Sequence, residues 1–321
     1  MKKGLGIGLL MIVLAGGVWY FVQKQEDDIV QQVEEDYMQN GIIRAYDRSN
    51  AQRLSESLGQ YMQYVLLLDD EVRFKEQVKI LKDHFLVERG SEVYIKWELG
   101  EKTATNAWID DIRISETLLQ AGKQFNEPSY LKLASRIETT LLKRQQIDGN
   151  IVDFYDWDLQ QATDVLHLNY LEPPALKRLQ LLDFAKEKVA QAKREGPFTA
   201  ELYYANQDES KWADDKVVNM IDQVLIERLR VGVTGKADET FQAFISKELK
   251  NGKVYARYDR LSAKPTMKDE SSSVYAMLVP LLTGEERSFV LNRLQEIETT
   301  NAKETHVFDV LNKAVILKEF E

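Results

Sequence analysis

The sequence predicts an all-α fold in which pairs of helices surround a common centre. Apolar residues recur mostly at helical spacing from residue 37 to the end of the chain. Only 6 prolines occur in 321 residues, and 44% of the residues are apolar, so the chain can bury a sizeable core. A short turn-containing pattern also recurs between the predicted helices. These observations favour one helical domain without an internal linker.

The apolar periodicity predicts the helix boundaries. Helices are expected over residues 52–69, 71–86, 108–123, 128–146, 173–193, 212–230, 237–249, 272–283, 285–299 and 304–319. The first of them carries an acid, Glu56, at the mouth of an otherwise apolar helix. An acid there interacts favourably with the helix N-terminus, so Glu56 is either an ordinary helix-stabilising residue or a functional one.

Three similar loops separate some of these helices. They read "NGIIRAYDR" at 40–48, "DGNIVDFYDWD" at 148–158 and "NGKVYARYDRL" at 251–261. In each, Asn or Asp before Gly supplies a tight turn, and the β-branched and aromatic residues that follow suit a short extended piece. Loops that recur between helix pairs indicate a toroid with its loops gathered at one mouth. Chance similarity of common NG turns is the alternative.

The N-terminus predicts a membrane anchor. Lys2 and Lys3 precede an uncharged run at 4–22, which is about as long as a bilayer core requires. The positive flank should stay in the cytoplasm, which places the rest of the chain outside the cell. We therefore expect an anchor at 1–23, a stalk or first helix at 24–36 and one domain at 37–321. A cleaved signal peptide, giving a secreted protein, is the rival interpretation.

Composition excludes several functions. The net charge is −10, whereas a nucleic-acid partner requires a basic face. The chain has no cysteine, so disulfides and thiolate chemistry are excluded, and its 3 histidines lie far apart in sequence. No phosphate-binding loop, GxSxG motif or metal-ligand spacing is present. We predict neither a metal nor another cofactor.

The remaining chemistry belongs to carboxylates and aromatic rings. Acids near predicted helix starts or in the recurring loops are Glu56, Asp110, Asp111, Asp153, Asp156, Asp158, Asp214, Asp215, Asp222 and Asp259. Every Trp outside the predicted anchor lies within a few residues of such an acid: Trp97, Trp108, Trp157 and Trp212. Tyr155 and Tyr258 accompany the loops. Rings stack on sugars, and two carboxyls in different environments cleave a glycosidic bond, so this combination favours a carbohydrate cleft. For each residue alone, a helix cap or a core position is the competing interpretation.

Four segments resemble glycoside hydrolase family 8, a family of bacterial cellulases, chitosanases and xylanases. Ser55-Glu56 and the apolar helix that follows resemble the acid-bearing Ser-Glu-Gly-Gln-Gly-Tyr-Gly-Met segment. The other three, in family order, are "NAWIDDIRISETLLQAG" at 106–122, "LNYLEPPALKRL" at 168–179 and "WADDKVVNMIDQVLIERL" at 212–229. Two of the three glycines of the first motif are missing, and the last match is weak.

The resemblance implies an (α/α)6 barrel and an inverting endo-glycosidase acting on a β-linked, amino-sugar-containing or other exopolysaccharide. Glu56 would be the general acid, Asp215 the base with Asp214 or Asp222 as alternatives, and Asp111 the acid that holds the sugar. Tyr170 would join the aromatic residues that bind substrate. Within the family, the chain resembles a remote branch, the membrane-tethered hydrolase-like proteins that accompany exopolysaccharide synthases in Gram-positive bacteria, which makes such a synthase a candidate partner.

Two other functions compete with the enzyme. A degenerate hydrolase that grips polysaccharide without cutting it is favoured by the lost motif residues. A helical-repeat scaffold that binds protein would require a repeat of about 34 or 40 residues, which the sequence does not show.

Overall fold

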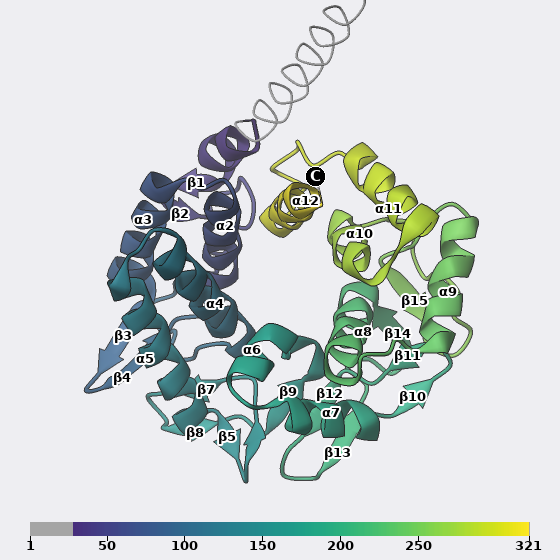
Figure 1. Cartoon of the computed structure of the whole chain (residues 1–321), viewed down its shortest axis with the longest axis horizontal. Helices are drawn as coiled ribbons and strands as arrows, with labels where there is room; N and C mark the ends of the chain where they lie inside the picture. Colours follow the sequence, from purple (N-terminus) through teal and green to yellow (C-terminus); the bar gives the residue numbers. More distant parts are fainter. Residues whose placement is uncertain (1–27, 321) are drawn as a thin grey trace, which may run out of the picture.

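The computed structural model describes residues 28–320, which form a closed ring of helices (Figure 1). The inner helices are α2 (Ser55–Leu67), α4 (Trp108–Gln124), α6 (Pro173–Arg178), α8 (Met220–Thr234), α10 (Ser272–Leu278) and α12 (Val307–Glu319). α2 packs on α4, α8 on α6 and α10, and α12 on both α10 and α2, which closes the ring. This arrangement confirms the predicted (α/α)6 barrel.

Outer helices cover the inner ones. They are α3 (Glu71–Ile80) with its π-helical extension η2 (Leu81–Phe85), α5 (Pro128–Arg144), α7 (Leu182–Gln191), α9 (Glu239–Lys250) and α11 (Gly284–Glu296). The sixth outer position is filled by helical residues 28–37, which include the π-helix η1 (Val33–Tyr37). The short 3-10 helices η3 (Leu168–Tyr170) and η4 (Val279–Leu281) complete the helical elements.

The two faces of the ring differ in their connections. An inner helix reaches the next outer helix through a few residues, such as Leu68–Asp70 after α2. An outer helix returns to the next inner helix through a longer segment, and these segments hold all the described strands. The long connections therefore lie at the N-terminal ends of the inner helices.

The strands are short and antiparallel. Hairpins are formed by β1 (Met38–Gln39) with β2 (Ile42–Ile43), β3 (Leu86–Arg89) with β4 (Glu92–Ile95), β5 (Gln146–Ile147) with β6 (Asn150–Ile151), β7 (Tyr155–Asp156) with β8 (Gln161–Ala162), and β10 (Arg194–Glu195) with β11 (Phe198–Thr199). β12 (Leu202–Tyr204) lies between β9 (Val165–His167) and β13 (Glu209–Lys211), and β14 (Val217–Asn219) pairs with β15 (Arg257–Asp259).

The three recurring loops all occupy the N-terminal face, in every second long connection. Asn40-Gly41 and Asp148-Gly149 form tight hairpin turns in which both residues have positive φ. The third copy differs, because Asn251 caps the C-terminus of α9 and only Gly252 has positive φ. The shared pattern therefore marks one face of the ring and not one type of turn.

Two predicted helices are wrong. The segment 173–193 is an inner helix, α6, and an outer helix, α7, separated by a turn at Leu179–Leu181. Gln180 takes a positive φ of 60° there, with no Gly or Pro to signal the break. The segment 212–230 becomes helical only at Met220, where Asn219 accepts a hydrogen bond from the backbone N–H of Ile221 as N-cap.

The predicted stalk is partly a helix of the domain. Val30, Val33 and Tyr37 are buried in the main core, and Tyr37 Oη donates a hydrogen bond to the carbonyl of Thr305. The predicted anchor at 4–22 lies outside the described residues. Within 28–320, no helix is both long enough and apolar enough to cross a membrane.

The approach of α2 to α4 depends on one glycine. A Cβ placed on Gly59 would lie 2.9 Å from the side chain of Ile114, so any larger residue would push the two helices apart. Their close contact brings the first turns of α2 and α4 together. Gly59 therefore helps to position the side chains described next.

Candidate active site

Polar side chains stand at the N-terminal end of every inner helix. They are Glu56 on α2, Asp110 on α4, Glu172 at the N-cap of α6, Asp222 on α8, Ser273 on α10 and Asp309 on α12. Because helix N-termini favour negative charge, these positions stabilise carboxylates that burial would otherwise neutralise. The residues form two clusters, one mainly on α2 and α4 and one around α8.

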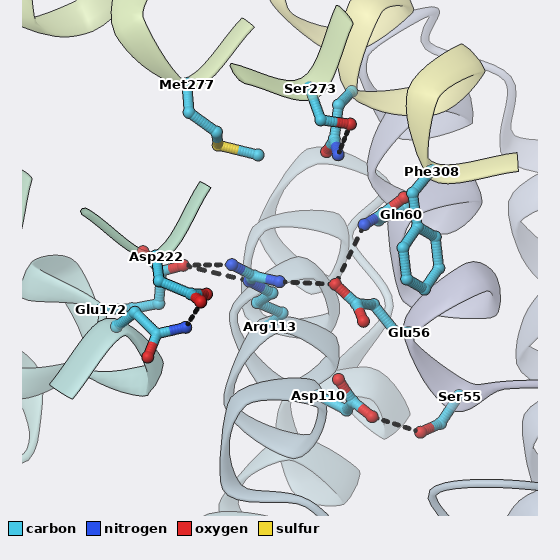
Figure 2. Close-up of polar contacts among 12 residues, drawn as sticks. Ser55, Glu56, Gln60, Asp110, Arg113, Glu172, Asp222, Ser273, Met277 and Phe308 are labelled. Atoms are coloured by element: carbon cyan, nitrogen blue, oxygen red, sulfur yellow. Dashed lines mark hydrogen bonds and ion pairs between the residues drawn. The ribbon is translucent and has the colours of Figure 1, made fainter. Parts of the chain in front are cut away.

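The α2–α4 cluster consists of Glu56, Asp110, Arg113 and Glu172 (Figure 2). Arg113 lies between two carboxylates: its Nη1 donates to Glu56 Oε1 at 3.0 Å, and its Nε and Nη2 donate to Glu172 Oε1 at 3.0 and 2.8 Å. Gln60 Nε2, one turn along α2, donates to Glu56 Oε1 at 3.2 Å. Glu56 is therefore held in one orientation by two donors.

Asp110 has a second partner in this cluster, Ser55. Ser55 Oγ lies 2.9 Å from Asp110 Oδ2 and 3.2 Å from the carbonyl oxygen of Trp97. Burial, with the charge of Glu56, raises the pKa of Asp110 to about 8. Ser55 Oγ is the donor in both contacts, and its single hydroxyl proton serves one of them at a time.

The charges within the cluster divide unequally. Although burial opposes it, Arg113 and Arg228 lower the pKa of Glu172, so Glu172 is the carboxylate that neutralises Arg113. Burial raises the pKa of Glu56 and outweighs the opposing effect of Arg113. Glu56 therefore carries the tendency to hold a proton that a general acid needs.

The α8 cluster consists of Asp153, His167, Asn169, Glu201 and Asp222. Asn169 Nδ2 donates to Asp222 Oδ1 at 2.9 Å. Burial and the charge of Glu201 raise the pKa of Asp222 to about 6, against the opposing charges of His167 and Arg257. Asp222 is thus mostly ionised at neutral pH. It can accept a proton there.

His167 is the titratable cation of this cluster. Its Nδ1 lies 2.6 Å from Asp153 Oδ2, and its backbone N–H donates to Asp153 Oδ1 at 2.7 Å. Burial opposes a charge on His167, but the hydrogen bond and charge of Asp153, with Asp222 and Glu201, raise its pKa. Its ring stacks on Tyr170 with centroids 4.8 Å apart.

Tyr170 connects the two clusters. Burial raises the pKa of its hydroxyl, and the charges of four acids add to this effect: Asp153, Asp110, Glu56 and Asp222. The ring is thus near carboxylates of both clusters.

A cavity of about 190 Å³ adjoins Glu56. Side chains of α8, α10 and α12 line it together with Glu56 and Arg113, including Ile221 and Leu225, which flank Asp222 on α8. A second cavity, of about 230 Å³, lies further along the ring axis. Arg113, Met277 and Asn312 line both and form the boundary between them.

The structure corrects the predicted sugar-holding acid. Asp111 is 1% exposed, and its Oδ2 accepts a hydrogen bond of 2.7 Å from Asn106, in the connection that precedes α4. Burial raises the pKa of Asp111 well above its usual value. Its neighbour Asp110 is the acid of this pair that lies beside Glu56.

The two preferred candidates for the general base, Asp215 and Asp214, lie outside the inner helices. Asp214 Oδ1 accepts from the backbone N–H groups of Lys216 and Val217, both at 2.8 Å, so it shapes the turn before β14. Asp215 is exposed in the same turn. Only the third candidate, Asp222, lies in the first turn of an inner helix.

The predicted sugar-binding rings separate into two groups. Trp97 is 37% exposed and its carbonyl contacts Ser55, while Trp212 is half-buried under the guanidinium of Arg260, 4.5 Å from its ring centroid. The rings that the structure buries are Trp108, Tyr155, Trp157 and Tyr258. For these four the expectation of sugar stacking is wrong, because each is at most 5% exposed.

The buried rings have structural roles. Tyr155 and Trp157 pack on Tyr94 in a small aromatic core beneath the loops. Tyr258 Oη donates to Glu248 at 2.7 Å. Among residues 28–320, no group of three or more His, Cys, Asp and Glu side chains is arranged to hold a metal ion.

The sequence contained a signal for the missed residues. Arg113 and its helix neighbours Asp110, Thr117 and Gln120 follow one another at intervals of 3 or 4, and Glu56, Gln60 and Gln63 do the same on α2. Such a polar stripe on an otherwise buried helix marks the side that faces the ring axis. Glu172, Asn169 and Glu201 lie in loops, where no periodicity indicates them.

The fold is the six-hairpin fold of glycoside hydrolase family 8. The structure is similar to endoglucanase Cel10, a family 8 glycosyl hydrolase from Klebsiella pneumoniae, with a TM-score of 0.66 at 14% identity, covering 91% of this chain and 99% of that one. It is also similar to an alpha-amylase from Clostridium perfringens, with a TM-score of 0.78 at 20% identity, covering 91% and 97%. At these identities the similarity shows the fold alone.

Two closer matches show the family. The sequence is 30% identical to the protein named "Putative lipoprotein YdaJ" of Bacillus subtilis over 266 residues, which cover 80% of this chain and 72% of that protein. The structure matches PssZ from Listeria monocytogenes with a TM-score of 0.86 at 36% identity, covering 91% of this chain and 95% of that one. The chain belongs to the family of these proteins, a branch with the family 8 fold. No protein-family model matches the sequence.

Proposed function

We propose that the chain is an inverting endo-glycosidase that cuts a polysaccharide outside the cell. The observation that carries this proposal is the position of two carboxyl groups. Glu56 and Asp222 lie in the first turns of α2 and α8, which are opposite each other in the ring of six inner helices. Glu56 lines a cavity that Ile221 and Leu225, neighbours of Asp222 on α8, also line, which supports a shared cleft for the two carboxyls.

The electrostatics assign opposite tasks to the two groups. Burial favours the protonated form of Glu56, which would donate its proton to the glycosidic oxygen as the bond to the anomeric carbon breaks. Asp222, with a pKa of about 6, would take a proton from a water that attacks the anomeric carbon from the other face. The product anomer is then inverted, and we expect the two carboxyls to be about 6.5–9.5 Å apart.

Other residues support the same chemistry. A neutral Asp110 beside Glu56 can hydrogen-bond a sugar hydroxyl without adding negative charge that would oppose a second carboxylate. Asn169 fixes Asp222 through the 2.9 Å contact. Trp97, which is exposed, and Trp212, which is half-buried, are the rings on which neighbouring sugars would stack.

We propose a membrane-tethered location for this activity. The N-terminal run at 4–22 fits an anchor, and the relative YdaJ is named as a lipoprotein, although the absence of cysteine in this chain excludes a lipid-modified one here. The active domain would then face the cell exterior, next to the polysaccharide it cuts and to a synthase that makes it.

Substitution of the acid tests the function. Glu56→Gln keeps the shape of the side chain and removes the transferable proton, so hydrolysis should fall by about 10²–10⁴ while polysaccharide binding persists. The control is Glu71→Gln, which changes an exposed acid in the first turn of α3. The substrates should include β-glucan, chitosan, xylan and starch, since one similar structure is an alpha-amylase. Full hydrolysis by Glu56→Gln would assign the acid to another residue.

One observation favours a second function, a module that grips polysaccharide without cutting it. The ion pair of 3.0 Å between Arg113 and Glu56 engages the carboxyl that should donate a proton. If the wild type binds a polymer but cuts none of the substrates, this second function replaces the first.

A further inference from the structure

Two carboxamide side chains contact the two carboxyls of the proposed mechanism. Gln60 Nε2, on α2, donates to Glu56 Oε1 at 3.2 Å, and Asn169 Nδ2, on η3, donates to Asp222 Oδ1 at 2.9 Å. Both amides are buried, at 7% and 6% exposure. Each amide therefore directs its nitrogen to one oxygen of one carboxyl.

The oxygens of the same two amides are unpaired. Gln60 Oε1 and Asn169 Oδ1 are enclosed by the protein and accept no hydrogen bond from the residues that the structure describes. A buried polar atom without a partner costs free energy that an apolar side chain of the same shape would not. Packing alone therefore does not account for an amide at either position.

Other buried amides of the chain show what a structural role requires. Gln145 Oε1 accepts from Asn106 Nδ2, and its Nε2 donates to the carbonyl of Asp153. Gln223 Oε1 accepts from the backbone N–H of Thr199, and its Nε2 donates to the carbonyl of the same residue. In both amides the nitrogen and the oxygen are paired. The amides at the two carboxyls differ, because only their nitrogens are used.

The amide contacts leave one oxygen of each carboxyl open. Arg113 Nη1 donates at 3.0 Å to the same Glu56 Oε1 that Gln60 contacts (Figure 2). Within residues 28–320, the side-chain hydrogen bonds to the two carboxyls all fall on Glu56 Oε1 and Asp222 Oδ1. An oxygen that accepts two hydrogen bonds is the carbonyl oxygen of a protonated carboxyl, so the proton of Glu56 belongs on Oε2.

We propose that Gln60 and Asn169 are positioning residues that fix the oxygen through which each carboxyl transfers its proton. Gln60, with Arg113, holds Glu56 Oε1, so Oε2 gives its proton to the glycosidic oxygen as the bond to the anomeric carbon breaks. Asn169 holds Asp222 Oδ1, so Oδ2 takes a proton from the water whose oxygen bonds to that carbon. This inference rests on the proposed function, because it treats the two carboxyls as acid and base.

The two amides are neutral groups in charged surroundings. The titratable groups around Glu56 are Asp110, Arg113, Tyr170, Glu172, His306 and Asp309. Those around Asp222 are Asp153, His167, Tyr170, Glu201 and Arg257. Removal of an amide leaves all these groups in place, so a change in pH dependence reports the lost hydrogen bond.

The test removes each amide without changing the size of the side chain. A carboxylate that loses a donor holds a proton more tightly, so Gln60→Met should move the alkaline limb of the kcat/KM profile to higher pH. Asn169→Leu should likewise move the acid limb to higher pH, and each variant should leave the other limb in place. Because the proton is then misplaced, kcat should fall by about 10–10²-fold with KM little changed.

The matched control is Gln77→Met. Gln77 lies on the outer helix α3, is 3% exposed and also has an unpaired amide oxygen, but it contacts neither carboxyl. This variant should move neither limb. Thermal melting should show that all three variants are folded, because each loses an unpaired buried oxygen. If one melts well below the wild type, the Ala variant at the same position replaces it with the same expectation.

A second measurement does not depend on hydrolysis. The carboxyl carbon-13 signals of Glu56 and Asp222 in the full chain are assigned by their loss in Glu56→Gln and Asp222→Asn, and they report each pKa directly. The pKa of Glu56 should rise in Gln60→Met, and that of Asp222 should rise in Asn169→Leu.

The outcomes separate this inference from the proposed function. Unmoved limbs and titrations in the two variants, or equal shifts in Gln77→Met, would overturn the positioning roles and leave the glycosidase standing. A raised KM with unchanged kcat would also overturn them, since the amides would then bind sugar. Moved titrations without hydrolysis of any polymer would overturn the proposed function and the catalytic role of the amides, but not their hold on the carboxyls.

Discussion

The α2–α4 cluster and the α8 cluster hold carboxylates at the same face of the ring by different structural means. In the first, the residues come from consecutive inner helices, and Arg113 reaches both Glu56 and Glu172 through helix packing. In the second, Asp222 lies on α8, and the other residues lie on β9, on η3 and in the connections before β7 and β12. Backbone N–H groups hold several of them, such as that of His167 on Asp153. Helix packing fixes the first cluster, whereas loop conformation fixes the second.

The two clusters also differ in their positive charge. Arg113 is charged at every pH that the fold survives, and it is matched by the ionised Glu172. His167 titrates, so the environment of Asp222 changes with pH. The first cluster therefore has a fixed charge and the second a variable one. This contrast leads to the predictions below.

The largest expected effect tests whether the α8 cluster contains the base. Asp222→Asn should lower kcat by about 10²–10⁴, since general base catalysis is worth this much. Asp215→Asn is the matched control, because Asp215 is an exposed acid in the turn that precedes the same helix. It should change kcat by less than about 2-fold. The reverse ranking would return the base to the turn and remove Asp222 from the mechanism.

The next prediction uses the pH dependence of activity to distinguish the fixed charge of Arg113 from the variable charge of His167. Activity should fall below a pH of about 6 as Asp222 gains a proton, and at higher pH as Glu56 loses one. Glu172→Gln leaves Arg113 less neutralised, which favours ionised Glu56, so the alkaline limb should move to lower pH. His167→Gln removes a cation near Asp222, so the acid limb should move up.

Each of these variants serves as the control of the other. Movement of both limbs by one variant, or of neither limb by both, would contradict the separation of the clusters. The measurement is the pH profile of kcat/KM, because it reports the groups of the free enzyme.

A smaller effect concerns stability. The folded-state pKa of Asp110, about 8, lies above its ordinary value near 3.8, so the folded state retains a proton that the unfolded chain releases as pH rises. Stability contributed by this group is therefore full below about pH 4 and is lost between there and pH 8. Asp110→Asn should therefore reduce the loss of melting temperature between pH 5 and pH 8. Each kcal/mol of stability recovered at pH 8 corresponds to roughly 2–4 °C.

The control for this prediction is Asp148→Asn, which changes an exposed acid in the β5–β6 turn. Asn tolerates positive φ, so the turn is preserved. An unchanged pH dependence of melting in Asp110→Asn would show that Asp110 is ionised in the folded state. The variant should also lose activity if Asp110 holds the sugar.

The contrast between the clusters also explains what the sequence could predict. The start of α2 and the place of Glu56 in its first turn follow from apolar periodicity, which predicts helix faces well. The start of α8 was placed too early, because residues 212–219 continue the apolar pattern while β14 and the Asn219 cap interrupt the helix. The expectation of Asp215 as base rests on the resemblance of this segment to a family 8 helix start, whereas α8 begins only at Met220.

Contacts between distant segments could not be predicted. The break at Gln180 carries no Gly or Pro, and the Glu172 contact with Arg113 joins residues that are 59 positions apart. Burial of Trp108 and Tyr258 depends on the way the loops fold over the barrel. Composition alone could not tell these rings from Trp97, which is exposed.

The smallest expected effect uses the exposed Trp97 and the half-buried Trp212, one next to each cluster. Trp97 precedes Glu98, which forms a β-bridge with Leu54 at the start of α2. Trp212 precedes Ala213, whose N–H donates to Glu201. Trp97→Ala should weaken polysaccharide binding by about 2–12-fold, because a stacked ring contributes about 0.5–1.5 kcal/mol beyond its buried area. Intrinsic fluorescence should shift on titration with the polymer, and Trp97→Phe should reduce that shift. Trp157→Phe, which changes a ring buried beneath the loops, is the matched control and should preserve it. If Trp97→Phe and Trp212→Phe together leave the whole shift in place, sugars stack on neither side of the cleft. The polymer would then be held by hydrogen bonds from the carboxylates and Arg113 alone.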